Sequence, residues 1–415
     1  MTKQPTITGI DVGNANIKVV VATIDPETFR PVVIGAGLTP SHGMRKGMVT
    51  DMEEIIQSVR AAAQQAHATA QTSIRRAFLS VSGMHMRTQV SRGVIAVSRA
   101  DNEISQHDID RVIQAASVIS LPPNREIVHV IPRTFIVDGT EHVKNPLGMK
   151  GVRLEAEVLI VEGMAPHIRN VVKCINEAGI EVAGLVYAPL AASLGALDKN
   201  QKEYGVVHLD IGGGTSSLAV FEESDLIHTA LFPVGSRHIT NDVAIALRTS
   251  MDIAERIKLE HGSTSDAIDL RKKDEIDLSE LIQDEPRMLP RKQLARVIDA
   301  RAHEVLDMTA AELKKISREG NLPAGVVLSG GGVHLPGFAA LAKEKLRLPV
   351  RIARSPHVDG MPEVVADPTF AVAIGLVMWG LDAEYGSGRT RSNALGGDGT
   401  GLGSRAIRWI KNFLP

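Results

Sequence analysis

Two stretches that place an aspartate, one apolar residue and then glycine between apolar runs constrain the fold most strongly. Residues 209–217 read Leu-Asp-Ile-Gly-Gly-Gly-Thr-Ser-Ser, and residues 10–16 repeat the spacing as Ile-Asp-Val-Gly-Asn-Ala-Asn. Apolar residues on both sides of a glycine turn predict a β-hairpin, and a turn without side chains leaves its N–H groups open to an anion. The sequence therefore predicts two hairpins that face one polyphosphate.

The acids of these hairpins are candidate metal ligands. We expect Asp11 and Asp210 to bind Mg²⁺, because this ion keeps several waters and binds through one or two carboxylates plus phosphate oxygens. Lys18 is expected to reach the outer phosphates as a point charge. For either hairpin alone, the alternative is an ordinary turn with an aspartate. The predicted phosphate-binding residues of the two hairpins are Gly13, Asn14, Ala15, Asn16, Lys18, Gly212, Gly213, Gly214 and Thr215.

A third glycine cluster, Gly330, Gly331 and Gly332, follows the apolar run at residues 326–328. A buried strand that ends in three glycines lets a flat ring or a phosphate lie against bare backbone. We therefore predict that these three glycines also bind the nucleotide.

Length and charge set the class of protein. A chain of 415 residues is too long for one typical core, so two or more domains are expected. The hydrophobic content of 44% indicates a globular protein, and the net charge of -2 argues against a nucleic-acid partner. The single cysteine, Cys174, excludes a disulfide framework and favours a reducing cytoplasm, with Cys174 itself expected to be buried. Residues 1–6 are polar and lead into a strand, so no signal peptide is expected.

The predicted elements indicate an insertion. Residues 1–83 alternate strands with a helix in an α/β pattern, whereas residues 84–163 contain a strand, an amphipathic helix capped by Ser105 and two more strands. We interpret the second stretch as an inserted βαββ subdomain. Three polar residues in it are expected to be solvated, namely His129, His142 and Lys144.

Two later stretches, residues 251–261 and 370–380, are predicted to be helices. In the predicted helix at residues 251–261, Glu255 and Lys258 lie three residues apart on one face, and spacing alone favours a surface ion pair. The longest apolar run, residues 370–380, is too short to span a bilayer. It follows Asp367-Pro368 and is therefore predicted to be a buried core helix.

With the three glycine clusters in this order, the chain resembles the actin, hsp70 and sugar-kinase superfamily. Within it, residues 233–244, the run Ala-Glu-Arg-Ile-Lys at 254–258 and the inserted subdomain resemble FtsA, a bacterial cell-division family. The resemblance covers roughly residues 5–382. It implies an α/β, actin-like two-lobed ATPase fold with ATP and Mg²⁺ in the cleft, and it favours Glu255 and Lys258 as nucleotide-binding residues near the ribose and base.

The resemblance also implies subdomain boundaries. We expect subdomain 1A to comprise residues 1–83, residues 164–203 and the closing helix 361–385, with the insertion 1C at 84–163. Subdomain 2A is expected at 204–237 and 309–360, and subdomain 2B at 238–308. A flexible linker at 386–403 and a membrane-targeting amphipathic helix at 404–415 are expected to follow.

One position departs from the ATPase pattern. Hsp70-type enzymes have an acid before the proline of the connecting helix, where this chain has Ala188 before Pro189. Alanine cannot orient an attacking water, so we predict tight ATP binding with weak or absent hydrolysis.

The last residues carry a membrane signal. After a Gly-rich stretch typical of a flexible linker, residues 404–415 form an amphipathic pattern with an apolar and a basic side. Such a helix is expected to sink its apolar side among acyl chains and to meet anionic lipids with its basic side. The alternative is a helix that docks on the protein's own body. The predicted membrane-binding residues are Arg405, Ile407, Arg408, Trp409, Ile410, Lys411, Phe413 and Leu414.

The FtsA resemblance implies a function. It predicts an adaptor that polymerises head to tail and links FtsZ filaments of the Z-ring to the cytoplasmic face of the inner membrane at the division site, as a peripheral protein. FtsZ is expected to dock on residues 238–308 and later division proteins on the insertion. The alternatives are a small-molecule kinase of the same fold, a chaperone-like ATPase and a pilus-assembly inner-membrane scaffold.

Overall fold

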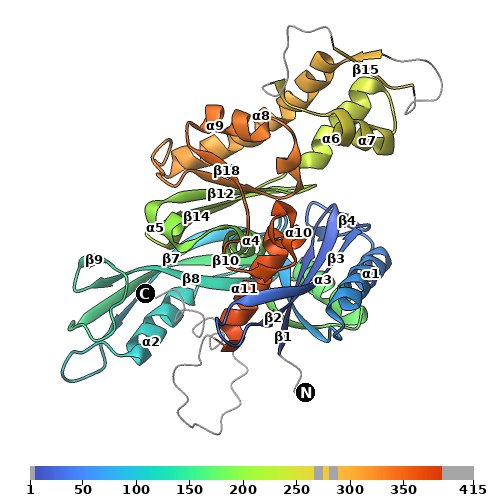
Figure 1. Ribbon diagram of the computed structural model, residues 1–415. Helices are drawn as coiled ribbons and strands as arrows, with labels where there is room; N and C mark the ends of the chain where they lie inside the picture. Colours follow the sequence, from blue (N-terminus) through green and yellow to red (C-terminus); the bar gives the residue numbers. More distant parts are fainter. Residues whose placement is uncertain (1–4, 266–273, 280–287, 386–415) are drawn as a thin grey trace.

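The computed structural model describes residues 5–265, 274–279 and 288–385. This part of the chain forms two main lobes, each built on a mixed β-sheet (Figure 1). The strand order is β11-β6-β1-β2-β3-β19 in the first sheet and β14-β13-β12-β17-β18 in the second. The predicted α/β class is therefore confirmed. The subdomain boundaries remain a prediction.

The first lobe packs two helices on its sheet. Its strands are β1 (Thr6–Val12), β2 (Asn16–Ile24), β3 (Pro31–Pro40), β6 (Arg76–Val81), β11 (Glu181–Tyr187) and β19 (Asp359–Gly360), with a small hairpin of β4 (Met44–Arg45) and β5 (Met48–Val49). Helices α1 (Met52–Ala70) and α3 (Ala165–Glu177) share a core with Ile10 and Leu79. The thiol of Cys174 is buried in this core, as predicted.

The second lobe repeats this arrangement. Its strands are β12 (Val206–Ile211), β13 (Ser216–Glu222), β14 (Asp225–Phe232), β17 (Val326–Ser329) and β18 (Val350–Ile352). Its helices are α5 (Lys199–Tyr204), α8 (Arg291–Lys315), the 3-10 turn η2 (Gly331–His334) and α9 (Phe338–Leu346). Leu209 and Leu328 from the strands pack with Leu306 from α8 in its core.

Two helices join the lobes. Helix α4 (Ala188–Ala196) crosses α11 (Ala371–Tyr385), which follows α10 (Pro362–Val365) and the 3-10 turn η3 (Pro368–Phe370). The crossing is so close that a Cβ on Gly375 would lie 1.7 Å from the carbonyl oxygen of Ala191. The core around these helices includes Ile7 of the first sheet and Phe221 of the second. The predicted buried core helix is thereby confirmed, although the turn η3, capped by Asp367, precedes it.

The insertion forms a separate layer. It consists of β7 (Arg87–Ala96), α2 (Gln106–Ser117), β8 (Arg125–Val137), β9 (Thr140–Val143) and β10 (Arg153–Met164), with the strand order β7-β10-β8-β9. Ser105 and Asp108 form the capping box that starts α2. The inserted subdomain with its strand, helix and two long strands is confirmed, and the structure adds the four-residue β9, which is too short for a periodic signal.

His129 contradicts the prediction that polar residues of the insertion are solvated. Its side chain is buried, and its Nε2 accepts a hydrogen bond of 3.0 Å from the N–H of Tyr187 in the first lobe. Burial lowers the pKa of His129 to about 4, so the ring is neutral. Lys144 is partly exposed and donates to the carbonyl oxygen of Glu223 in the second lobe. The side chain of His142 lies outside the described part.

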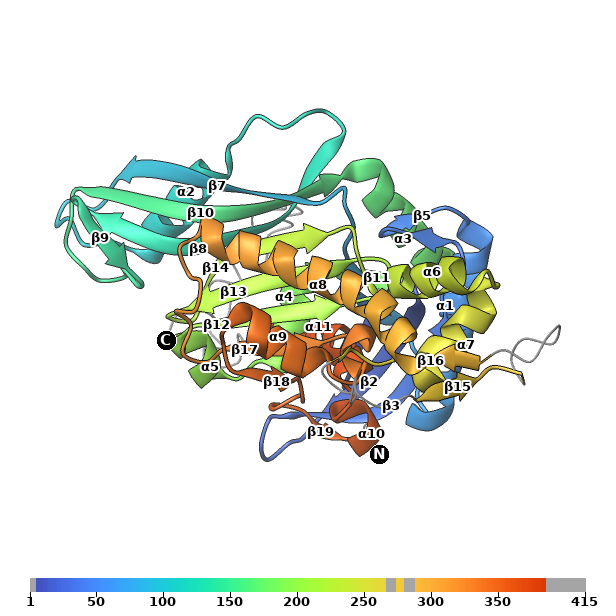
Figure 2. The same cartoon turned by 90° about the horizontal axis from the view of Figure 1, so that it is seen from above.

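A small lobe caps the second one. Helices α6 (Ser236–Leu247) and α7 (Met251–His261) pack with the first turns of α8 and with the strand pair β15 (Glu275–Asp277) and β16 (Met288–Pro290). Seen from above, the insertion and this small lobe lie at opposite ends of the molecule, and α8 runs between them (Figure 2).

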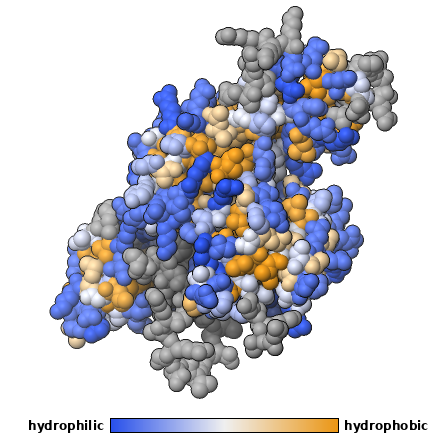
Figure 3. Space-filling view, viewed as in Figure 1, coloured by the Kyte–Doolittle hydropathy of each residue, from blue (hydrophilic) through white to orange (hydrophobic). Residues whose placement is uncertain are grey.

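On the face shown in Figure 3, apolar side chains form several separate areas. Four large apolar side chains in the described part of the small lobe are exposed, those of Ile245, Met251, Leu259 and Met288. Within the described ranges, no helix combines the length and the apolar character needed to cross a bilayer.

Candidate functional site

The first predicted hairpin forms between β1 and β2. The two strands pair in register with Asp11 opposite Lys18, and the N–H of Gly13 closes the turn on the carbonyl oxygen of Asn16 at 3.1 Å. The side chain of Asn14 accepts from the N–H of Gly47 at 2.9 Å, so it anchors the turn to the β4–β5 hairpin. The carbonyl oxygen of Ala15 likewise accepts the N–H of Ser41.

The second hairpin has the same construction in the other lobe. Strands β12 and β13 pair antiparallel, and the N–H of Gly212 donates to the carbonyl oxygen of Thr215 at 3.0 Å. In the described part of the chain, the N–H groups of Gly213 and Gly214 donate to no protein acceptor. They therefore remain available to an anion.

The two hairpin turns face each other across the lobes. A Cβ added to Gly213 would lie 2.6 Å from the Cβ of Ala15, and one added to Gly214 would lie 2.8 Å from the side chain of Asn14. Only glycine permits this approach. Arg237, at the start of α6, also bridges the turns by donating to the carbonyl oxygen of Asn14 at 3.2 Å.

The two aspartates lie within each other's electrostatic field. Burial raises the pKa of Asp210, and the charge of Asp11 raises it further, whereas the Ser329 hydroxyl and Lys18 lower it. Lys18 Nζ lies 3.6 Å from Asp11 Oδ2. Two carboxylates that repel each other in this way are suited to a cation.

This donor set fits Mg²⁺ with a nucleotide. Among the described residues, no cluster of three or more His, Cys, Asp or Glu side chains forms a complete metal site. Two carboxylates are sufficient for Mg²⁺, because waters and phosphate oxygens complete its coordination. Asp11, Asp210, Lys18 and the glycine turns would hold the ion and the phosphates.

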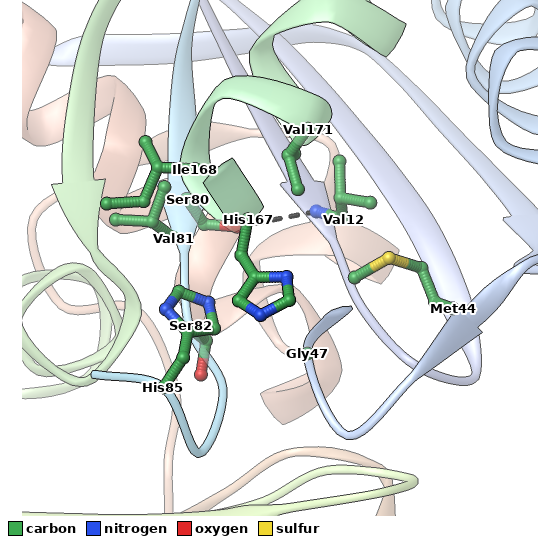
Figure 4. A pocket seen from close by; sticks show the side chains of 10 residues that line it. All are labelled: Val12, Met44, Gly47, Ser80, Val81, Ser82, His85, His167, Ile168 and Val171. Atoms are coloured by element: carbon green, nitrogen blue, oxygen red, sulfur yellow. Dashed lines mark hydrogen bonds between the residues drawn. The ribbon is translucent and has the colours of Figure 1, made fainter. Parts of the chain in front are cut away.

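A small cavity lies behind the first turn (Figure 4). It is lined by Val12, Ser80, His85 and His167, among others. The two imidazole ring centres are 5.1 Å apart, and burial, with the second ring as a lesser cause, lowers the pKa of His85 to about 4. We assign no ligand to this cavity.

The third glycine cluster is only partly open. A Cβ on Gly330 or Gly332 would meet Ile211 at 2.5 or 2.3 Å, so packing against β12 explains both glycines. By contrast, a Cβ on Gly331 would have no atom within 4 Å. Gly331 is therefore the member of the cluster against which a ligand has room to lie.

Glu255 and Lys258 form the predicted pair. Lys258 Nζ lies 2.7 Å from Glu255 Oε2 and also donates to Thr240 Oγ1 at 3.0 Å. The expectation of a surface ion pair was wrong in one respect, since the Lys258 side chain is only 9% exposed while that of Glu255 is 40% exposed. The hydroxyl of Thr240 also donates to Glu255.

Four residues next to the aspartates were not predicted from sequence. Ser80 donates to Asp11, Ser329 donates to Asp210, His208 contacts Ser329, and Arg237 bridges the turns. Only Arg237, which lies in residues 233–244 named above for the family resemblance, carried a local signal. The predicted linker 386–403 and the membrane-binding residues of 404–415 lie outside the described residues.

Two family models match the chain. A model described as "Cell division protein FtsA" matches residues 207–375, and a model described as "SHS2 domain inserted in FTSA" matches residues 83–162. The second match coincides with the inserted layer of β7 to β10.

Curated relatives align over most of the chain. The chain is 36% identical to cell division protein FtsA of Bacillus subtilis over 380 residues. This alignment covers 91% of the chain and 84% of the Bacillus subtilis protein. The chain is 35% identical over 378 residues to FtsA of Pseudomonas aeruginosa, with 91% and 90% covered. For FtsA of Escherichia coli K12 the identity is 32% over 390 residues, with 92% of both covered.

Solved structures share the fold at lower identity. The PilM-PilN type IV pilus biogenesis complex contains a chain with a TM-score of 0.66 and 17% identity, covering 90% of this chain and 98% of that one. MreB 5 of Spiroplasma citri bound to AMPPNP has a TM-score of 0.52 and 13% identity, with 91% and 96% covered. These similarities show the actin-like fold.

Proposed function

The chain belongs to the FtsA family of cell division proteins, and from this premise we propose that it is an ATP-binding, actin-like adaptor. In this proposal it polymerises on the cytoplasmic face of the inner membrane, anchors FtsZ filaments of the Z-ring there and helps to recruit later division proteins. The observation that carries the nucleotide part is the opposition of two acid-and-glycine hairpins from different lobes.

In the proposed nucleotide site, separate groups of residues contact the phosphates with Mg²⁺, the adenosine, and the ribose or base. The free N–H groups of Gly213 and Gly214, together with Lys18, bind phosphate oxygens, and the carboxylates of Asp11 and Asp210 hold Mg²⁺ through its waters or directly. Gly331 provides bare backbone for the adenosine. Glu255 and Lys258 are proposed to contact the ribose or base, for which Glu255 has the more exposed side chain.

The aspartate pair gives a direct test of the nucleotide site. Asp11→Asn and Asp210→Asn each remove one charge without changing shape. We expect the gain in ATP affinity on adding Mg²⁺ to be smaller in each variant than in the wild type, by a factor of about ten or more. Calorimetric titration of ATP with Mg²⁺ and with EDTA measures this. Asp110→Asn, a change in helix α2 of the insertion, is the control. Unchanged Mg²⁺-dependent affinity in both cleft variants would contradict the site.

Hydrolysis is proposed to be slow. Ala188 is buried at the first position of α4, and its methyl group cannot orient a water molecule. We expect phosphate release well below the roughly 1–100 s⁻¹ of kinases. A phosphate-release assay with saturating Mg·ATP measures the rate, and turnover within the kinase range would contradict the prediction.

The partners are assigned to separate surfaces. We propose that residues 404–415 bind anionic lipids through Trp409, Phe413 and their basic neighbours. FtsZ is proposed to dock on the small lobe, where apolar side chains are exposed and Pro290, Lys292, Gln293, Arg296 and Val297 line an open groove. This combination suits an acidic peptide with apolar anchors. Later division proteins are assigned to the insertion, and head-to-tail contacts between copies would build filaments.

The alternative functions have less support. The relatives at 32–36% identity are cell division proteins, whereas the pilus protein shares 17% identity and the fold alone. A small-molecule kinase of this fold would consume ATP in the presence of its sugar, which a coupled assay over common sugars would detect.

A further inference from the structure

The two site aspartates have equivalent serine partners in the two lobes. Strand β1 runs parallel to β6 with Ile10 beside Leu79, which places Asp11 next to Ser80. Strand β12 runs parallel to β17 with Asp210 beside Ser329. Ser80 Oγ donates to Asp11 Oδ1 at 2.8 Å, and Ser329 Oγ donates to Asp210 Oδ1 at 2.6 Å. The same pair is therefore built twice, from residues that are far apart in sequence.

The direction of the first bond is fixed by its surroundings. Ser80 is 5% exposed, and its Oγ accepts the backbone N–H of Val12 at 3.3 Å (Figure 4). A hydroxyl has one hydrogen to donate, and a backbone N–H approaches its lone pairs. The hydrogen of Ser80 is thus directed to Asp11.

The second bond is fixed by a histidine. His208 is 1% exposed, its Nε2 lies 2.9 Å from Ser329 Oγ, and its Nδ1 lies 3.3 Å from Ser193 Oγ. Because Ser329 gives its only hydrogen to Asp210, Nε2 must carry the proton of the ring and donate to Ser329. Ser193 Oγ donates its own hydrogen to the carbonyl oxygen of Pro189 at 2.7 Å, so its longer contact with Nδ1 does not compete for the ring proton on Nε2.

Each carboxylate accepts its serine hydroxyl through Oδ1, which restricts rotation of the carboxylate plane. Oδ2 of Asp11 faces Lys18 Nζ at 3.6 Å, and the serines leave the Oδ2 atoms of both aspartates to other ligands. Mg²⁺ demands near-ideal octahedral geometry, so the orientation of an acid that binds it or its waters affects affinity. Groups that orient metal ligands typically change metal affinity 10–100-fold when removed.

We propose that Ser80 and Ser329 are positioning residues that orient Asp11 and Asp210 for the metal of the bound nucleotide, and that His208 orients the Ser329 hydroxyl. This inference rests on the proposed nucleotide site. It assigns the serines a role in Mg²⁺ affinity and none in contacts with the nucleotide itself.

The test separates metal affinity from nucleotide affinity. Binding of a fluorescent ATP analogue to the full chain is measured in EDTA, and Mg²⁺ is then titrated into the saturated complex. For Ser80→Ala and Ser329→Ala we expect a Mg²⁺ dissociation constant raised about 10-fold or more, with the affinity in EDTA unchanged. Thr309→Val, which removes a buried hydroxyl bonded to the Val305 carbonyl in α8, should leave both values unchanged.

The role of His208 has its own readout. His208→Leu should raise the Mg²⁺ constant in the same direction as Ser329→Ala, and the double variant should show no further increase, because the histidine acts through the serine. Circular dichroism establishes that each variant is folded. If the serine variants titrate Mg²⁺ like the wild type, or lose affinity equally in EDTA, the positioning role is overturned. A wild-type chain that binds no nucleotide in either condition would instead overturn the proposed function along with it.

Discussion

The glycines around the cleft differ in why they are glycine. Gly213, Gly330 and Gly332 each lie where a Cβ would collide with the protein itself, whereas Gly331 borders open space. A glycine required by packing and a glycine required by a ligand have different mutational signatures. The two kinds can therefore be separated by experiment within one cluster.

For Gly331→Ala we expect wild-type stability and ATP binding weakened about tenfold, because the methyl group occupies space that the adenosine needs. For Gly332→Ala we expect a loss of about 1–3 kcal/mol of stability, since the Cβ would lie 2.3 Å from Ile211 Cγ2. Thermal unfolding and fluorescent ATP titration on both variants measure these effects. Equal ATP affinity in Gly331→Ala and the wild type would remove this glycine from the site.

Single residues could be proposed from sequence where the signal is local. The aspartates and turn glycines were found because each hairpin is continuous in the chain. Ser80 and Ser329 escaped prediction because they act on aspartates 69 and 119 residues away, through parallel strand pairs. A serine on an apolar strand has no local feature that reveals such a partner.

Among the elements, those with strong caps or periodicity were predicted closely. Helix α2 begins with the Ser105 capping box, and α1 begins after Asp51, whose carboxylate accepts the N–H of Glu54. Two of the missed elements, β9 and α5, have four and six residues and are too short for a periodic pattern. The burial of His129 was missed because it depends on contact between the insertion and strand β11.

The contact at His129 predicts a pH dependence. Its pKa is lowered from 6.5 to about 4 in the folded chain, so the neutral ring stabilises the fold above about pH 6.5, and this stability is lost as the pH falls toward 4. At pH 5.5 the loss is about 1 kcal/mol relative to neutral pH. His129→Gln cannot titrate and retains an acceptor for the Tyr187 N–H.

Urea unfolding at pH 7.5 and pH 5.5 measures this contribution. The wild type should lose about 1 kcal/mol more than His129→Gln between the two pH values. His107→Gln, the same substitution at an exposed position of α2, should behave like the wild type. Identical losses in all three proteins would show that His129 does not contribute.

At the scale of the whole molecule, the order of the glycine motifs along the chain indicated the fold. The packing of distant segments against each other could not be predicted from the sequence. Three glycine clusters in sequence order indicated an actin-like fold, which the similarity to MreB 5 supports. The crossing of α4 and α11 and the approach of the two hairpin turns depend on contacts between distant segments, which the pattern within each segment does not encode. The membrane and partner surfaces remain proposals.

The most direct test of the adaptor proposal is flotation of FtsZ filaments with anionic vesicles. With the full chain and Mg·ATP, we predict that FtsZ rises with the vesicles, and that Trp409→Glu with Phe413→Glu abolishes this by preventing apolar insertion. Ser404→Glu with Asn412→Glu adds the same charge without removing an apolar anchor, and should reduce flotation only partly. FtsZ that stays at the bottom with the wild type, or floats equally with the Trp409 and Phe413 variant, would contradict the account.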